Sequence, residues 1–130
     1  MARMRTWKLL CRVGMLAAAL ALTACVEKPI KTMVAGGEPK QGKQLIEAYG
    51  CAACHAIPGV DHLGSNVGPP LEKFGLRAYV GGVLPNNPEN LVRWLMNPPA
   101  IDPRTAMPNL GVSESEARHM AAYLYTLKAK

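Results

Sequence analysis

Apolar residues recur at helical spacing in three stretches of the chain, and each stretch has a recognisable start. The first expected helix runs from about Pro39 to Tyr49, because proline suits the opening position of a helix. Leu45, Ile46 and Tyr49 form one apolar stripe on it. Gly50 follows directly and is expected to end the helix.

The second expected helix follows the run Asn87-Pro88-Glu89, in which asparagine is a good N-cap and proline fits the first turn. Its apolar positions are Leu91, Val92, Trp94 and Leu95. The pair Pro98-Pro99 is expected to lie beyond its end. The third helix begins at Ser113, and Glu116 three residues later completes a capping box. Its expected buried face is Ala117, Met120, Ala121, Leu124 and Leu127.

No segment alternates apolar and polar residues as a half-buried strand does, and proline and glycine are frequent in the middle of the chain. A short helical turn is expected around Leu71 to Phe74. The pattern therefore predicts an all-α fold with three main helices, short turns and long loops.

The N-terminus is predicted to be a secretory signal of the lipoprotein type over residues 1–24. It has four basic residues and then ten apolar residues from Val13 to Leu22, too few to span a bilayer. The run Leu22-Thr23-Ala24-Cys25 is similar to a bacterial lipobox, so Cys25 is expected to be the first mature residue and to carry lipid. Ordinary cleavage that leaves Cys25 as a free thiol, and an uncleaved anchor, are the alternatives.

Residues 25–38 are predicted to be a lipid-anchored flexible tether, because they hold Pro29, Gly36 and Gly37 and no apolar period. Residues 39–130 are predicted to form one domain. A domain of this size is marginal if its core is made of side chains alone, so a bound cofactor is expected. Export and the anchor together predict a location on the periplasmic side of a bacterial membrane.

The excess of basic over acidic residues lies mainly in the predicted signal. The formal net charge is +6, but four of the fifteen lysines and arginines and none of the nine acidic residues lie in residues 1–24. The mature chain would have eleven minus nine, or +2. This balance gives no support to binding of nucleic acid.

The run Cys51-Ala52-Ala53-Cys54-His55 is typical of covalent attachment of a c-type haem. The thiols of Cys51 and Cys54 add to the two vinyl groups of the porphyrin, and His55 binds the iron. A zinc half-site would need a second pair of ligands at short spacing, which Cys11 and Cys25 do not form. A thioredoxin-like redox pair would need a βαβ context, and no good strand surrounds residue 51.

Met107 is the expected second axial ligand of the iron. It lies in a segment without helical or strand period, and Pro103 and Pro108 stiffen that segment. The other candidates are Met96, Met120, His62 and His119. The two methionines are expected to pack in helices. His119 is expected to face solvent, and His62 lies close to His55 in the sequence.

Taken together, these motifs resemble the class I monohaem cytochromes c over residues 40–128. The resemblance rests on Gly42, CxxCH at 51–55, Gly68-Pro69-Pro70-Leu71, Trp94 to Pro98, Met107 and Ala122-Tyr123-Leu124. The stretch Asn90 to Leu127 is especially similar to bacterial cytochromes c that work with terminal oxidases. The resemblance implies a small cytochrome c fold wrapped around one covalently attached haem c.

The resemblance also implies roles for single residues. Cys51 and Cys54 would make the thioether links, and His55 and Met107 would be the axial ligands. The Pro69 carbonyl would accept the proton of His55 Nδ1.

Four further contacts follow from the resemblance. Arg77 would approach a haem propionate, although a surface arginine is an equal alternative. Trp94 would pack on the haem near the methionine, and Thr105 would lie near the buried propionate. Gly42 would admit the ring of Tyr123 where the first and last helices cross.

The implied function is single-electron transfer in a respiratory chain rather than enzymatic catalysis. The expected partners are a terminal oxidase and a quinol-cytochrome c oxidoreductase-type complex or a dehydrogenase. A haem c subunit of an oxidase or dehydrogenase complex, and a haem enzyme or sensor with a labile sixth ligand, are the alternatives.

Overall fold

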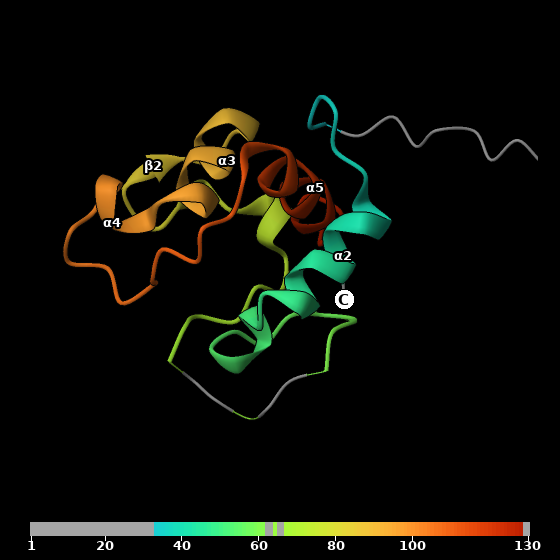
Figure 1. Ribbon diagram of the computed structural model, residues 1–130, viewed down its shortest axis with the longest axis horizontal. Coiled ribbons are helices and arrows are strands. Elements are labelled where there is room, and N and C mark those ends of the chain that lie inside the picture. The colour runs from blue at the N-terminus through green and yellow to red at the C-terminus, as the bar shows by residue number, and fades with distance from the viewer. Residues whose placement is uncertain (1–32, 62–63, 65–66, 129–130) are drawn as a thin grey trace, which may run out of the picture. The chain divides into compact units, whose positions relative to one another are not determined.

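The computed structural model of the protein describes residues 33–61, 64 and 67–128 (Figure 1). The predicted signal at 1–24, the lipidation site Cys25 and the rival ligand His62 lie outside the described residues. None of the helices in the described part of the chain has the length and apolar character that a membrane crossing requires.

Helix α2 spans Pro39–Ala48, within one residue of the expected bounds. Glu38 is its N-cap, and the Glu38 carboxylate accepts a hydrogen bond from the backbone N–H of Lys40 at 3.3 Å. The chain leaves the helix through Gly50, whose φ of +67° is a left-handed conformation that glycine adopts without steric cost. The prediction for this helix is confirmed.

Helices α3 and α5 also begin directly after the N-caps that the sequence predicted. Helix α3 spans Pro88–Met96, and the Asn87 side chain accepts from the N–H of Asn90 at 2.9 Å. Helix α5 spans Glu114–Leu124, and both bonds of the predicted capping box between Ser113 and Glu116 are present. All of the apolar residues expected to be buried on these two helices, and Leu127 just beyond α5, are buried.

Helix α3 ends before Pro98-Pro99, as expected, and the proline pair begins a further short helix that was not expected. A short helix, α4, spans Pro98–Ile101, and the Asn97 side chain caps it by accepting from the N–H of Ala100 at 3.3 Å. Proline is tolerated in a first turn because the N–H it lacks has no helical partner there. The proline pair therefore separates two helices.

The middle of the chain holds two further differences from expectation. The predicted turn at Leu71 to Phe74 is closed by a bond from the N–H of Phe74 to the carbonyl of Leu71 at 3.2 Å, and the 3₁₀ helix η2 follows it at Phe74–Leu76. A small antiparallel hairpin pairs β1, Tyr79–Val80, with β2, Leu84–Pro85. No strand was expected, because two-residue strands are too short to show an alternating pattern. The fold remains mostly helical.

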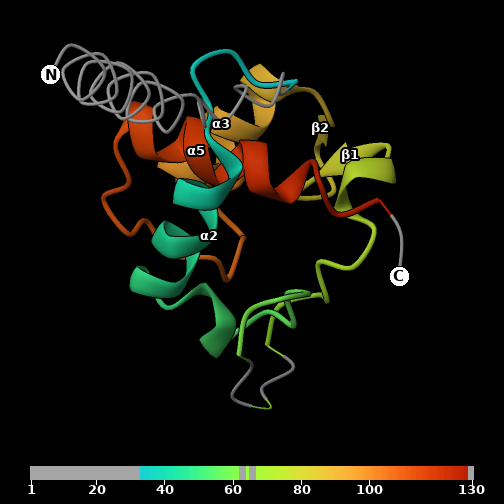
Figure 2. The same cartoon turned by 90° about the vertical axis from the view of Figure 1, so that its right-hand side faces the viewer.

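Helix α5 packs against both α2 and α3 and is the centre of the domain (Figures 1 and 2). At its crossing with α2, a Cβ on Gly42 would lie 1.9 Å from the backbone oxygen of His119. The contact at Gly42 is thus backbone to backbone. The expected partner, Tyr123, instead donates its hydroxyl proton to the carbonyl of Pro58 at 2.6 Å.

The end of the predicted tether is part of the packed domain. Val34 is fully buried, and the guanidinium of Arg118 on α5 donates to the carbonyl of Ala35 at 3.4 Å. The backbone N–H of Glu38 donates to His119 Nδ1 at 2.9 Å, so His119 is engaged with this segment rather than simply facing solvent. The single apolar side chain of Val34 fills a core site, which a search for apolar periodicity does not reveal.

Candidate functional site

A cavity of about 430 Å³ lies between the segment after α2, the loop 67–71, the hairpin, α3 and the loop 105–110. Its volume is within the range of roughly 300–1,000 Å³ that is usual for ligand sites. Its wall is largely apolar. Among the described residues that line it, Arg77 is the permanently charged one and no carboxylate is present.

The two cysteines enter the cavity from the turn after α2. The 3₁₀ helix η1 spans Cys51–Ala53, and the backbone N–H of Cys54 donates to the carbonyl of Cys51 at 3.2 Å. Both thiols are free and half-buried. Burial raises the pKa of the Cys51 thiol, which therefore stays protonated at neutral pH. The turn places both sulfur-bearing residues along one wall of the same cavity.

The imidazole of His55 is fixed from two sides. Its Nδ1 lies 2.8 Å from the carbonyl oxygen of Pro69, as expected. A carbonyl can only accept, so Nδ1 carries the proton and Nε2 keeps a free lone pair. Gly68 packs on the ring so closely that a Cβ would lie 2.4–2.8 Å from three ring atoms. His55 is therefore oriented as a ligand with one available nitrogen.

Loop 67–71 is held against the cysteine motif by backbone bonds. The N–H of Gly68 donates to the carbonyl of Cys54, and the N–H of Leu71 donates to the carbonyl of Ala56, both at 2.8 Å. These bonds keep Pro69 in place beneath His55.

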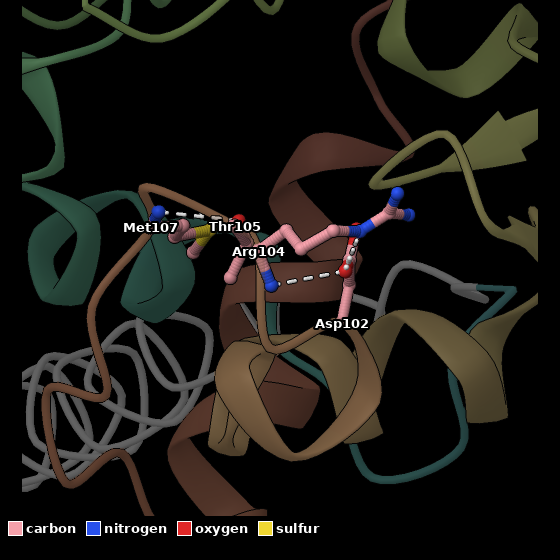
Figure 3. Close-up of polar contacts among 4 residues, drawn as sticks. All are labelled: Asp102, Arg104, Thr105 and Met107. Carbon is pink, nitrogen blue, oxygen red and sulfur yellow. Dashed lines mark hydrogen bonds and ion pairs between the residues drawn. The ribbon is translucent and has the colours of Figure 1, made fainter.

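Met107 lines the cavity from a loop that is fastened by two successive side-chain turns (Figure 3). Asp102 Oδ1 accepts from the backbone N–H of Arg104 at 3.1 Å, and Thr105 Oγ1 accepts from the N–H of Met107 at 3.2 Å. Such turns replace regular secondary structure with local hydrogen bonds. In the described part of the chain, Met96 and Met120 are not part of the cavity wall.

Arg77 is half-buried at the cavity, on the segment that carries η2. Its guanidinium donates to the carbonyl of Pro70 and, at 3.4 Å, to that of Glu72. It also lies over the ring of Phe74, 5.7 Å from the ring centroid. These contacts hold the charge at the cavity wall rather than free in solvent.

Trp94 and Thr105 line the cavity as well. Trp94 is 7% exposed, and the turn of the hairpin lies flat against its ring. A Cβ on Gly81 would be 2.5–2.7 Å from three atoms of the indole, and Gly81 also has a φ of +59°. Gly81 therefore has to be glycine for two reasons, and it fixes the position of Trp94.

Two of the residues that support the site were missed from the sequence. Asn86 donates through Nδ2 to the carbonyls of Phe74 and Arg77 at 3.1 and 3.0 Å, and its Oδ1 accepts from Tyr125 at 2.8 Å. Gly81, which packs on Trp94, is the other. The asparagine carried no local signal, whereas two adjacent glycines after Tyr79-Val80 are a hairpin signal that could have been used.

The residues present fit a c-type haem. Two thiols, an oriented imidazole and a thioether line one apolar cavity, and an arginine is available for an anionic group. Among the described residues, no group of three His, Cys, Asp or Glu side chains is arranged to hold a metal ion directly. The donor set therefore suits a porphyrin-bound iron better than the zinc alternative.

Comparison with known proteins gives a consistent result. The sequence profile of the family described as Cytochrome c matches residues 39–128. Cytochrome c oxidase subunit 2 of Alkalihalophilus pseudofirmus is 35% identical over 108 residues, which are 82% of this chain and 29% of that protein. Cytochrome c oxidase subunit 2 of Bacillus subtilis is 36% identical over 95 residues, 70% of this chain and 27% of that protein. The chain thus spans less than a third of the length of these relatives.

The fold has a counterpart among solved structures. Cytochrome c2 from Rhodobacter sphaeroides superposes with a TM-score of 0.51 at 18% identity, covering 72% of this chain and 98% of that one. At this identity the likeness concerns the fold alone. It agrees with the mostly helical architecture around one cavity.

Proposed function

Because this chain belongs to the cytochrome c family, in which haem c is covalently attached and electrons are transferred, we propose that it is a lipid-anchored electron carrier of a bacterial respiratory chain. It receives electrons from a quinol-oxidising complex or a dehydrogenase and delivers them to a terminal oxidase. The observation that carries the proposal is the convergence of Cys51, Cys54, His55 and Met107 on one apolar cavity.

In this proposal Cys51 and Cys54 hold the haem, and His55 Nε2 and Met107 Sδ bind the iron. The free lone pair of His55 and the hydrogen-bonded turn before Met107 support these roles. With both ligands supplied by this chain, the iron would have no position open to substrate, which suits electron transfer rather than catalysis.

The bound haem supplies a one-electron couple between Fe(II) and Fe(III). The side chains of this protein tune that couple. The bond to the Pro69 carbonyl would make His55 a stronger electron donor to the iron, whereas the thioether of Met107 and the apolar wall would favour the reduced form. We expect the effects of Met107 and the apolar wall to outweigh that of Pro69, so that the midpoint potential is positive. Arg77 and Thr105 are proposed to bind the propionates, and Trp94 to pack on the ring.

A terminal oxidase is the proposed electron acceptor because the relatives at 35 and 36% identity are oxidase subunits. The near balance of charge in the mature chain predicts docking that depends weakly on ionic strength. Attachment through Cys25 on the periplasmic side would compensate by raising the local concentration.

A second candidate is a haem c subunit that stays bound to an oxidase or dehydrogenase complex. The same relatives favour it, because in them the matching region is part of an oxidase subunit. Purification distinguishes the two: a carrier separates from the complex in mild detergent, and a subunit co-purifies in fixed ratio. A haem enzyme or sensor is a third candidate, and rapid binding of carbon monoxide by the ferrous protein would favour it.

The proposal is tested with the full-length protein purified from membranes. Pre-reduced protein is mixed with detergent-solubilised terminal oxidase of the same organism, and oxidation of its α-band is followed together with oxygen uptake. We expect oxidation coupled to oxygen uptake and a rate that falls less than tenfold when the ionic strength is raised from about 10 to 150 mM. Absence of oxidation, with the oxidase active toward another donor, would contradict the assignment of the acceptor.

A further inference from the structure

The chain between α2 and the first cysteine of the haem motif is fastened from outside the motif. Helix α2 ends at Ala48, and Tyr49 and Gly50 lead directly into Cys51. The Tyr49 hydroxyl donates to Glu116 Oε2 on α5 at 3.0 Å, across 67 residues of sequence. Tyr49 also lines the cavity, so this bond connects the haem site to the C-terminal helix.

The acceptor of this bond is held rigidly. Glu116 Oε2 also accepts from the backbone N–H of Ser113 at 3.0 Å and from its hydroxyl at 2.5 Å, as the capping box of α5. The bonds from Ser113 and Tyr49 lower the pKa of Glu116, and the bond to Glu116 raises the pKa of Tyr49. At neutral pH the pair is therefore a carboxylate and a protonated phenol, as the bond requires.

The bond between Tyr49 and Glu116 lies away from the point where helices α2 and α5 cross. Helices α2 and α5 touch backbone to backbone at Gly42 and His119, and this contact sets where they cross. Tyr49 lies seven residues further along, about 10 Å beyond the crossing. A bond at that distance controls the direction in which the end of α2 points, and so the position of Cys51.

The other half of the motif is held by a different part of the chain. The carbonyl of Cys54 and the imidazole of His55 are bonded to Gly68 and Pro69. The N–H groups of Cys54 and His55 also donate to the carbonyl of Cys51, at 3.2 and 3.0 Å. Loop 67–71 thus holds the motif directly at Cys54 and His55, whereas Tyr49 connects the approach to Cys51 with α5.

We propose that Tyr49 and Glu116 are a positioning pair that places the thiol of Cys51 for thioether formation. In this step the Cys51 S–H adds across a vinyl double bond of the haem. One S–C bond and one C–H bond form, the S–H bond and the π bond break, and nothing leaves or changes net oxidation state. Because the pair acts on one end of the motif, its loss impairs attachment at Cys51 and spares Cys54.

The test compares Tyr49→Phe with wild type, both produced as the full chain in a host that attaches haem c. The purified proteins are unfolded and alkylated, and mass spectrometry of peptides gives the free thiol at Cys51 and at Cys54. Phenylalanine keeps the ring and deletes the hydroxyl. We expect the ratio of free Cys51 to free Cys54 to rise about fivefold, the factor that corresponds to one hydrogen bond of typical strength.

Tyr123→Phe is the matched control, because it deletes a tyrosine hydroxyl on α5 that does not bond to Glu116 but donates to the carbonyl of Pro58 at 2.6 Å. It should leave the ratio unchanged even if it lowers stability. Glu116→Gln keeps an acceptor oxygen and should raise the ratio less than Glu116→Ala. The double variant Tyr49→Phe with Glu116→Ala should not raise the ratio above that of Glu116→Ala alone, because both substitutions remove the same bond.

The proposal fails if Tyr49→Phe frees both thiols equally or frees neither. If Tyr49→Phe yields too little protein, Glu116→Gln and Glu116→Ala decide by the same ratio. The inference rests on Cys51 and Cys54 as the attachment sites. Wild-type protein with both thiols free would refute that assignment, which is a different result from an unchanged ratio in the variant.

Discussion

The imidazole Nδ1 of His55 lies 2.8 Å from the carbonyl oxygen of Pro69, and Gly68 lies against the face of the same ring. One dipeptide thus determines both the tautomer and the orientation of the proposed iron ligand. In the neutral imidazole, Nε2 is then the nitrogen with the free lone pair.

Gly68→Ala should displace the imidazole, because the added Cβ would lie 2.4–2.8 Å from the ring. Overpacking of this kind costs about 1–3 kcal/mol, and here it acts on the proposed ligand. We expect lower thermal stability of the holoprotein. We also expect a weaker hydrogen bond between His55 and Pro69, measured as a wider spread of midpoint potentials in a redox titration and as a broadened Soret band. Gly111→Ala is the control: Gly111 has a φ of +71° but no atom near its Cβ, so the variant should lose stability with an unchanged spectrum.

Met107→Ala should abolish the weak near-infrared sulfur-to-iron charge-transfer band of the oxidised protein. The reason is that Met107 is the methionine of the described residues that lines the cavity. Ferrous Met107→Ala should also bind carbon monoxide rapidly at neutral pH. Met120→Leu is the control, because Met120 is 1% exposed in the core and should affect stability without loss of the band. Persistence of the band in Met107→Ala would assign the ligand elsewhere.

Asp102→Asn should change the acid sensitivity of the Met107 loop. Hydrogen bonds from the backbone and side chain of Arg104 lower the pKa of Asp102 from its ordinary value of 3.8. A carboxylate with a lowered pKa in the folded state stabilises the fold above pH 3.8, and this contribution is lost as the pH falls through the folded-state pKa. The wild-type near-infrared band should therefore weaken in acid more steeply than that of Asp102→Asn. Parallel acid profiles for the two proteins would contradict this role.

Cys25 should carry lipid in the mature protein. Intact mass spectrometry of membrane-extracted protein should show a chain that begins at Cys25, one haem and two or three acyl chains. Cys25→Ser should move the protein from the membrane fraction to the soluble periplasmic fraction without changing the visible spectrum. An unmodified Cys25 in the membrane-extracted protein would remove the anchor from the proposal.

The helices could be predicted because their ends carry local signals. Asn87 before α3, Ser113 with Glu116 at α5 and Gly50 after α2 each act on backbone groups within a few residues. The reactive residues of the site were equally visible, since covalent chemistry fixes the spacing of Cys51, Cys54 and His55. These features depend on near neighbours and can be read from a single sequence.

The remaining features depend on tertiary contacts. The position of Trp94 is fixed where Gly81 packs on its ring, and Val34 is fully buried in the core. Gly42 lies against the backbone oxygen of His119, a contact that no spacing encodes. Such contacts join residues far apart in the sequence, so a local pattern cannot predict them.

Tyr125 should make stability fall at alkaline pH. Its hydroxyl donates to Asn86 Oδ1 at 2.8 Å, and burial, with a smaller effect of Glu89, raises the pKa of Tyr125 to about 12 from 10.0. The folded state therefore keeps this proton where the unfolded state loses it. Its stabilising contribution is complete below pH 10 and is lost as the pH rises from 10 to about 12.

The free energy of unfolding of Tyr125→Phe, measured in denaturant at pH 7 to 12, tests this expectation. At pH 7 the variant should be less stable by about 1 kcal/mol, because it loses a hydrogen bond and leaves an acceptor of Asn86 unpaired. Between pH 10 and 12 wild type should lose stability faster than the variant, so the two curves converge. A constant difference between wild type and Tyr125→Phe across this range would mean that Tyr125 ionises equally in both states.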